Sequence, residues 1–157
     1  MKTSFQSFAA ITGVLLVLIY AIGAGLWTNT GDNWYRSLNS PSWQPPDFVF
    51  GLIWPYNFVV LGFAAVTVAK NLSTPKVITY LSFFAISVVC ALIWAYQFYR
   101  PHNLEFASFA LAATALLTLP MIFLLYQAST SVFIAILPYQ IWVILASFLS
   151  ASYAKLN

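Results

Sequence analysis

The longest charge-free stretch of the chain decides the fold; residues 106–154 read FASFALAATALLTLPMIFLLYQASTSVFIAILPYQIWVILASFLSASYA. Its 49 residues contain no Asp, Glu, Lys or Arg. A helix needs about 20 apolar residues to cross a bilayer, so this stretch is long enough for two crossings. Its polar cluster Gln127–Ser131 is typical of a turn between paired helices. We therefore predict two transmembrane helices here, at about 105–126 and 132–154.

Three further charge-free stretches, residues 3–31, 48–69 and 77–99, are each long enough for one crossing. Apolar runs such as Ile11–Tyr20 do not alternate with polar residues, as barrel strands would. Charged residues make up 6% of the 157 residues. Soluble domains carry about 25%, so the solvent of this chain is lipid. The sequence predicts an all-α integral membrane protein with one domain over 1–157, a five-transmembrane-helix bundle with helices at about 7–27, 48–69, 77–99, 105–126 and 132–154.

The few ionisable residues exclude several classes of protein. Six Lys or Arg residues are spread singly along the chain, so no basic surface for nucleic acid is expected. Cys90 and His102 are each the only residue of their type, and three acidic residues accompany them. We therefore expect no metal site and no catalytic triad. Five crossings put the loop 28–47 on the same side as Lys155, but the basic residues divide three against three between the sides and indicate no orientation.

The loop at residues 28–47 is unlike a random linker, since it contains two Trp, one Tyr and three Pro. Proline fixes φ and removes amide donors, so Pro41, Pro45 and Pro46 stiffen the segment. The aromatic side chains add rigid apolar faces with a polar edge. Two interpretations remain open from composition alone. The aromatics anchor the loop at the headgroup level of the membrane, or the loop is a rigid lid over a cavity between the helices.

Several motifs of this loop and the following helices resemble one known family. The loop contains Trp34-Tyr35-x-x-Leu38-x-x-Pro41-x-Trp43-x-Pro45-Pro46, followed by Phe50-Gly51-x-x-Trp54. Further matches are Trp94, Phe98-Tyr99, Pro138-Tyr139-x-x-Trp142-x-x-x-Ala146 and Leu156-Asn157. Together they resemble the signature of the tryptophan-rich sensory protein or translocator protein family, once called peripheral-type benzodiazepine receptors. The resemblance covers nearly the whole chain.

This resemblance implies a five-helix bundle, often a homodimer, that binds porphyrins, haem or related tetrapyrroles and other flat hydrophobic molecules. Porphyrin or haem would be a ligand, with no obligatory cofactor. Membrane lipid, including sterol, would be a further partner, and the membrane would be a bacterial cell membrane or that of an organelle. The family's pocket lies inside the bundle beneath the first loop. Carried over by motif position, the ligand-binding residues would be Trp34, Leu38, Trp43, Trp54, Trp94, Trp142 and Ala146, with no catalytic residue.

The physical character of these residues agrees with such a pocket. Aromatic faces suit a flat conjugated macrocycle, and Trp54 and Trp142 lie within predicted spans rather than at the headgroup level. Asn57 follows Trp54 by one helical turn, and a buried amide in a bilayer is costly unless paired. It either contacts the ligand or covers the carbonyl that Pro55 leaves free.

Two positions depart from the family pattern. Ala91 stands where many relatives have an Asn, and Ala110 where many have an Asp. Ser87, Ala91 and Ala95 form a ridge at four-residue spacing, which allows close helix approach in lipid, either with a neighbouring helix or across a dimer. The missing polar groups put the polar half of a ligand site in question.

Two other functions compete with ligand binding and sensing. Relatives have been credited with light-dependent porphyrin breakdown, in which Trp54 and Trp142 would be redox-active neighbours. Transport of tetrapyrroles or sterol-like lipids is the other, and few intramembrane ionisable groups are present to couple it to an ion gradient. Leu149-x-x-x-Tyr153-x-Lys155 also fits the loose pattern proposed for sterol contact, which arises easily by chance.

Overall fold

The computed structural model describes residues 2–157. Over this range the chain forms six helices and no strand. Their bounds are α1 Lys2–Trp27, α2 Asn33–Ser37, α3 Asp47–Asn71, α4 Thr74–Tyr99, α5 Leu104–Ala128 and α6 Thr130–Leu156.

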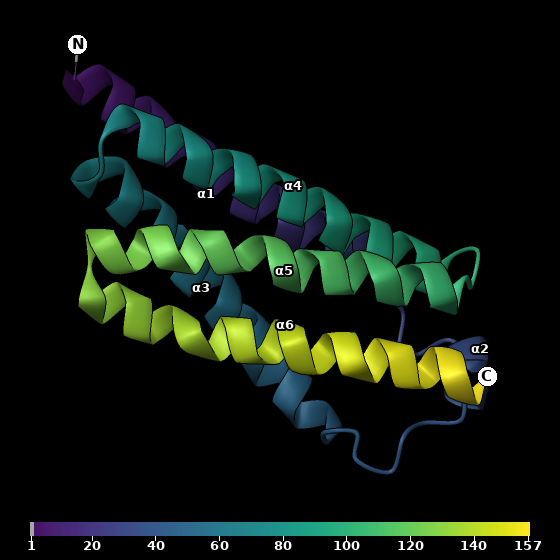
Figure 1. Cartoon of the computed structure of the whole chain (residues 1–157). Helices are drawn as coiled ribbons and strands as arrows, with labels where there is room; N and C mark the ends of the chain where they lie inside the picture. Colours follow the sequence, from purple (N-terminus) through teal and green to yellow (C-terminus); the bar gives the residue numbers. More distant parts are fainter. Residues whose placement is uncertain (1) are drawn as a thin grey trace.

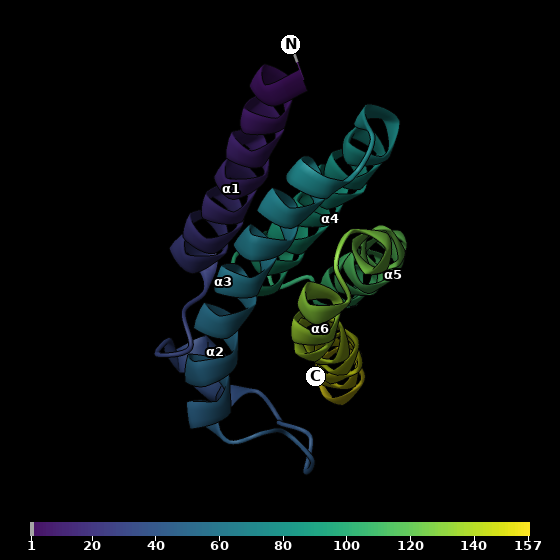
Figure 2. The same cartoon turned by 90° about the vertical axis from the view of Figure 1, so that its left-hand side faces the viewer.

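The long helices form a closed bundle in which sequence neighbours are not always spatial neighbours (Figure 1). Helix α1 packs against α3 and α4, α4 against α5, α5 against α6, and α6 against α3. Seen from the end, the pair α5 and α6 lies on the opposite side of the bundle from α1 (Figure 2). The segment with α2 lies beside the C-terminal end of α6, at the opposite end from the N-terminus. The loop 28–47 and the C-terminus therefore share one end, as predicted.

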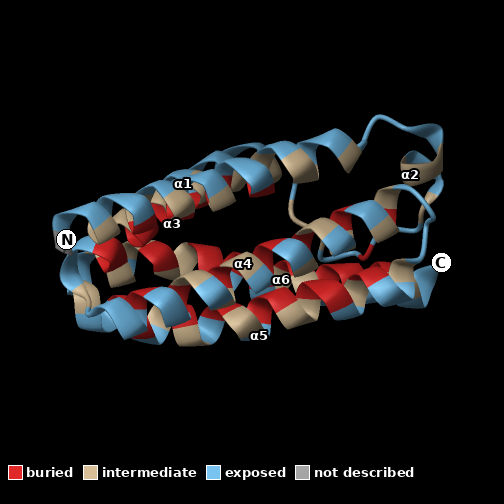
Figure 3. Ribbon diagram, turned by 90° about the horizontal axis from the view of Figure 1, so that it is seen from above, coloured by how far each residue is buried: buried red, intermediate tan, exposed pale blue. Residues whose placement is uncertain are grey.

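Five of the six helices in residues 2–157 are long and apolar enough to cross a membrane, with mean hydropathy between 1.8 and 2.3. Buried residues lie on the faces that the helices turn toward one another, and exposed residues cover the outside (Figure 3). Large apolar side chains such as Phe63, Phe109, Phe123 and Phe148 are each 65% exposed on that outer surface. Only lipid solvates such a surface. The prediction of an all-α integral membrane protein with five spans is confirmed.

The helices are longer than the predicted ranges because polar residues at their ends are satisfied locally. Helix α1 begins at Lys2 rather than near residue 7; within its first turns Ser7 Oγ donates to the Thr3 carbonyl at 3.0 Å. Helix α6 begins at Thr130 because Ser129 caps it, accepting from Val132 N at 3.4 Å. The predicted loop also contains a helix, α2, which Asp32 caps by accepting from Trp34 N at 3.0 Å.

The ridge of Ser87, Ala91 and Ala95 is completely buried inside this chain, so it belongs to helix packing within the bundle. At its first residue, Thr114 Oγ1 of α5 donates to the Ser87 carbonyl at 3.4 Å. The next polar contact joins α5 to α6, where Thr118 Oγ1 donates to Gln140 Oε1 at 2.6 Å. Small residues therefore let α4, α5 and α6 approach, and hydrogen bonds connect them in the apolar interior.

Candidate ligand-binding site

A cavity of about 780 Å³ lies in the half of the bundle that the segment 28–47 covers. Its walls come from α1, α3, α4 and α6, while α5 contributes none of its lining residues. Segment 28–47 supplies its outer wall, including Tyr35 and Leu38. Pockets for drug-sized ligands span about 300–1,000 Å³, so the cavity is large enough for a sizeable small molecule.

Three tryptophans from three different helices form the aromatic part of the wall: Trp54 of α3, Trp94 of α4 and Trp142 of α6. Phe58 lies one helical turn after Trp54 and stacks on it, with the ring centroids 5.7 Å apart and the planes at 27°. Phe50 of α3 meets Trp142 of α6 edge to face, with the ring centroids 5.1 Å apart. These contacts fix the indole rings, so the aromatic faces are already in place before a ligand binds.

A hydrogen bond fixes the third indole. Trp94 Nε1 donates to Ser150 Oγ at 3.2 Å, and both residues line the cavity. Ala146 precedes Ser150 by one turn of α6 and provides a small surface between Trp142 and the outer part of the wall. The α6 face therefore alternates bulky and small residues, which leaves room beside the rings.

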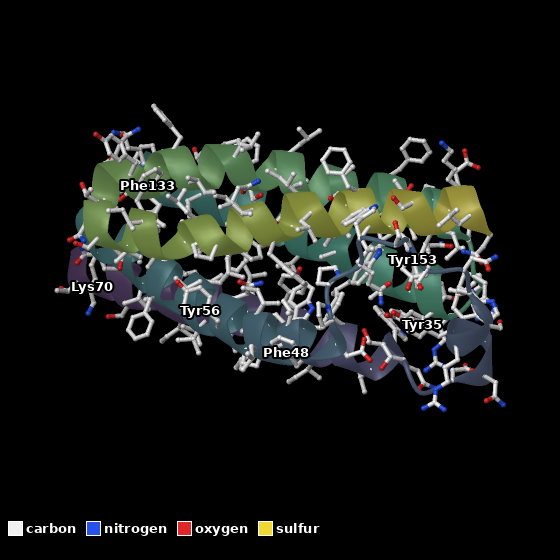
Figure 4. The ribbon with its side chains drawn as sticks, turned by 90° about the horizontal axis from the view of Figure 1, so that it is seen from below. Tyr35, Phe48, Tyr56, Lys70, Phe133 and Tyr153 are labelled. Carbon is white, nitrogen blue, oxygen red and sulfur yellow. The ribbon has the colours of Figure 1, made fainter. Side chains whose placement is uncertain are left out.

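The outer end of the cavity is more polar than the rest. Tyr153 of α6 donates its hydroxyl hydrogen to Gln44 Oε1, which ties the covering segment to the bundle. Tyr35 of α2 packs near Tyr153, with ring centroids 6.1 Å apart (Figure 4). Burial, with a smaller contribution from Tyr153, raises the pKa of the Tyr35 phenol well above its usual value. Tyr35 therefore presents a neutral hydroxyl at physiological pH.

Two exposed charged residues, Arg36 and Asp47, also line this outer end. The Arg36 guanidinium at the mouth could pair with a carboxylate on one edge of a flat apolar ligand, whereas Asp47 would repel it. Over residues 2–157, no three His, Cys, Asp or Glu side chains gather as ligands of a metal would.

The structure brings five of the eight candidate site residues to the cavity wall: Leu38, Trp54, Trp94, Trp142 and Ala146. It does not bring Trp34, Trp43 or Asn57 there. Trp34 points from α2 toward the α4–α5 loop and stacks on His102, with centroids 3.6 Å apart and planes at 11°. Trp43 is 47% exposed on the surface of the covering segment, and Asn57 is completely buried one turn beyond Trp54.

The structure excludes one of the two alternatives that the sequence left open for Asn57, and contact with a ligand stays a prediction. Neither its amide nitrogen nor its amide oxygen has a hydrogen-bond partner, so it does not cover the carbonyl freed by Pro55. The two positions that depart from the family pattern are not part of the cavity. Ala91 and Ala110 are buried and lie outside the cavity wall, so the missing polar groups remove nothing from its lining.

The covering segment is also fastened to the end of α6. Asn39 N donates to Asn157 Oδ1 at 2.8 Å, and Asn157 Nδ2 donates back to the Asn39 carbonyl at 3.2 Å. Asn39 Nδ2 adds a third bond, to the Leu156 carbonyl at 3.3 Å. This clamp holds the segment over the cavity from the middle of its length.

Replacing Asn157 by alanine removes two of these bonds and should loosen the segment. We expect amide hydrogen exchange in residues 38–44 to become about fivefold faster or more, since each of the two lost hydrogen bonds contributes about 0.5–1.5 kcal/mol. The thermal midpoint of the bundle should change little. Asn71→Ala, an exposed Asn at the end of α3 far from the segment, is the control. Unchanged exchange in Asn157→Ala would mean that other contacts position the segment.

The fold and the cavity define a class: a polytopic helical membrane protein with an aromatic cavity beneath a clamped extramembrane segment. The TspO/MBR family model matches residues 11–156, and the chain belongs to this family.

Individual relatives agree with that assignment. The chain is 26% identical to a tryptophan-rich sensory protein of Cereibacter sphaeroides over 147 residues, which cover 90% of this chain and 91% of that protein. It is 27% identical to the tryptophan-rich protein TspO of Chlorobaculum tepidum, over 100% of this chain and 99% of that protein. The human translocator protein is 24% identical over 77% of this chain and 73% of its own length.

Proposed function

We propose that the cavity binds a planar tetrapyrrole such as a porphyrin or haem, and that this binding is the basis of a sensory function. The observation that carries the proposal is the aromatic wall of Trp54, Trp94 and Trp142 beneath the covering segment. A rigid conjugated ring loses little entropy on binding and gains stacking and area burial against pre-positioned indoles.

Of the two charges at the cavity mouth, Arg36 supports a particular orientation of the ligand, and the Asp47 carboxylate would repel a ligand carboxylate placed beside it. Porphyrins carry carboxylates on one edge and apolar substituents on the opposite edge. Arg36 lies at the outer, water-facing end of the cavity, and the apolar side chains lie deeper. The carboxylate edge would therefore face Arg36 and the opposite edge would enter the bundle.

Titration of the whole protein in nanodiscs with protoporphyrin tests the proposal. We expect saturable quenching of tryptophan fluorescence that reaches its limit at one porphyrin per chain, because three of the six tryptophans line one cavity. Empty nanodiscs are the essential control, since porphyrins partition into lipid. Quenching that grows linearly with porphyrin, as partitioning alone would give, would contradict the proposal.

The same sample separates binding from photochemical breakdown. Illuminating the saturated complex and following the porphyrin absorption spectrum would reveal a new product if the chain acts as an enzyme on its ligand. A binding protein leaves the spectrum unchanged apart from bleaching at the rate seen in empty nanodiscs.

A further inference from the structure

A group of buried polar atoms lies next to the aromatic wall of the cavity, and of the residues that carry them Trp142 lines it. They are the hydroxyl groups of Tyr20 and Tyr139, both amide atoms of Asn57 and the indole nitrogen of Trp142. None of them has a partner at hydrogen-bond geometry, although the hydroxyl groups of Tyr20 and Tyr139 lie near enough to interact with each other, and each of these residues is at most 6% exposed. Three helices contribute them, α1, α3 and α6. Leaving such groups unpaired in an apolar interior is costly, so a partner is expected.

Helical spacing places this group directly beneath the aromatic wall. Asn57 lies one turn after the cavity residue Trp54 on α3, and Tyr139 lies one turn before Trp142 on α6. Tyr20 packs edge to face against Trp54 at 6.1 Å and against Phe58 at 5.3 Å. Tyr20 and Tyr139 also approach each other from α1 and α6. Trp142 connects the two regions, because its ring lines the cavity and its nitrogen belongs to the buried group.

Elsewhere in the described chain the fold satisfies its buried polar side chains. Gln140, on the turn beside Tyr139, receives a hydrogen bond from Thr118 and donates its own to the Ala115 carbonyl at 3.0 Å. Ser150 receives one from Trp94. In residues 2–157 the unpaired buried side-chain atoms all belong to these four residues, and Trp142 among them lines the cavity.

We propose that Asn57, Trp142, Tyr20 and Tyr139 form a polar subsite that receives a neutral oxygen substituent, a hydroxyl or carbonyl, on the inner edge of the bound ligand. This inference rests on the proposed tetrapyrrole function. The indole N–H donates, the amide both donates and accepts, and the phenols do either, so an uncharged oxygen is satisfied whichever role it takes. No Lys, Arg or His is among these residues to balance a carboxylate at this depth.

Two porphyrins that differ only in this feature provide the test. Mesoporphyrin carries two ethyl groups where haematoporphyrin carries two 1-hydroxyethyl groups, and both carry the same two propionates. We expect the ratio of haematoporphyrin binding to mesoporphyrin binding to be higher for the protein than for empty nanodiscs. Asn57→Leu, which keeps the approximate shape of the side chain, should reduce that preference about threefold to tenfold, the effect of one neutral hydrogen bond.

Thermal stability of the ligand-free variants provides a second readout. Asn57→Leu should leave the midpoint unchanged or raise it, because it removes an amide that the protein does not pair. Gln140→Leu is the matched control: it removes a buried amide that is paired at both ends, so it should lower the midpoint and leave the porphyrin preference unchanged.

The outcomes separate the two proposals. If both porphyrins bind saturably and the ratio of their affinities is the same in the unmutated protein and in Asn57→Leu, the polar subsite is overturned. The proposed function would still stand. A large loss of stability in Asn57→Leu would also overturn the polar subsite, because the amide would then be paired within the fold. Absence of saturable binding by either porphyrin would overturn both proposals.

Discussion

Replacing Trp54 or Trp142 by alanine should weaken porphyrin binding about tenfold or more. Stacking on an aromatic side chain contributes about 0.5–1.5 kcal/mol beyond area burial, and the loss of a whole indole also removes apolar contact area. A tenfold change in affinity corresponds to about 1.4 kcal/mol, which these two contributions together reach or exceed. The measurement is a titration of each variant in nanodiscs, followed by porphyrin absorption so that the readout does not depend on the deleted tryptophan.

Two tryptophans outside the cavity provide matched controls. Trp27 packs edge to face on Tyr96 at 5.4 Å, and Trp43 is largely on the surface. Neither lines the cavity, so Trp27→Ala and Trp43→Ala should bind porphyrin with nearly the affinity of the unmutated protein. Equal affinities in all four variants would place the ligand elsewhere on the molecule.

Replacing Gly13 by alanine should produce the largest loss of stability among small substitutions. A methyl group at Gly13 on α1 would collide with Cβ of Ala65 on α3, and the Ala65 Cα would lie only 3.6 Å away. Neither neighbour is a flexible side chain, so the two helices would have to separate. Overpacking of a fitted core typically costs about 1–3 kcal/mol. We expect a lower thermal midpoint in detergent and less folded protein in the membrane fraction.

Gly62→Ala in α3 is the control, since an added methyl group there meets nothing within 4 Å. Both substitutions make the same chemical change inside a transmembrane helix, so intrinsic helix propensity affects them alike. Gly62→Ala should be neutral or slightly stabilising. If Gly13→Ala proves as stable as Gly62→Ala, then α1 does not approach α3 as closely as described.

Charge placement predicted the transmembrane architecture because lipid imposes so strong a constraint. Four stretches without charge, and one polar turn at Gln127–Ser131, gave the number and order of the spans. Helix ends were less predictable, since they depend on local capping by residues such as Ser129 and Asn103. Helix α2 was missed, although Asp32 before Asn33 is a recognisable N-cap signal.

The candidate site was predicted better on the long helices than in the covering segment: four of five helical candidates line the cavity, all but Asn57, whereas Leu38 alone of three candidates in the segment does. Trp54, Trp94 and Trp142 lie in spans whose inward faces are fixed by packing, and all three line the cavity. Trp34 and Trp43 lie in the covering segment, where the direction of a side chain depends on α2 and on contacts such as the Trp34–His102 stack. No local pattern predicts that contact.

Long-range contacts explain the residues that sequence reasoning missed. Tyr153 and Gln44 are 109 residues apart in sequence, and Trp94 and Ser150 are 56 apart. Each pair connects two different elements that contribute to the cavity wall. Such a contact is visible only in the three-dimensional arrangement. The family motifs include Trp94 without indicating its partner, and Tyr153 belongs only to the loose pattern for sterol contact.

The central claim is that a planar tetrapyrrole occupies the cavity beneath residues 28–47. The structure of the complex with protoporphyrin tests it most directly. The account predicts the macrocycle between Trp54 and Trp142, with its carboxylates toward Arg36 and the Asn39–Asn157 clamp closed above it. A porphyrin found on the lipid-facing surface of the helices, with the cavity free of it, would contradict the account.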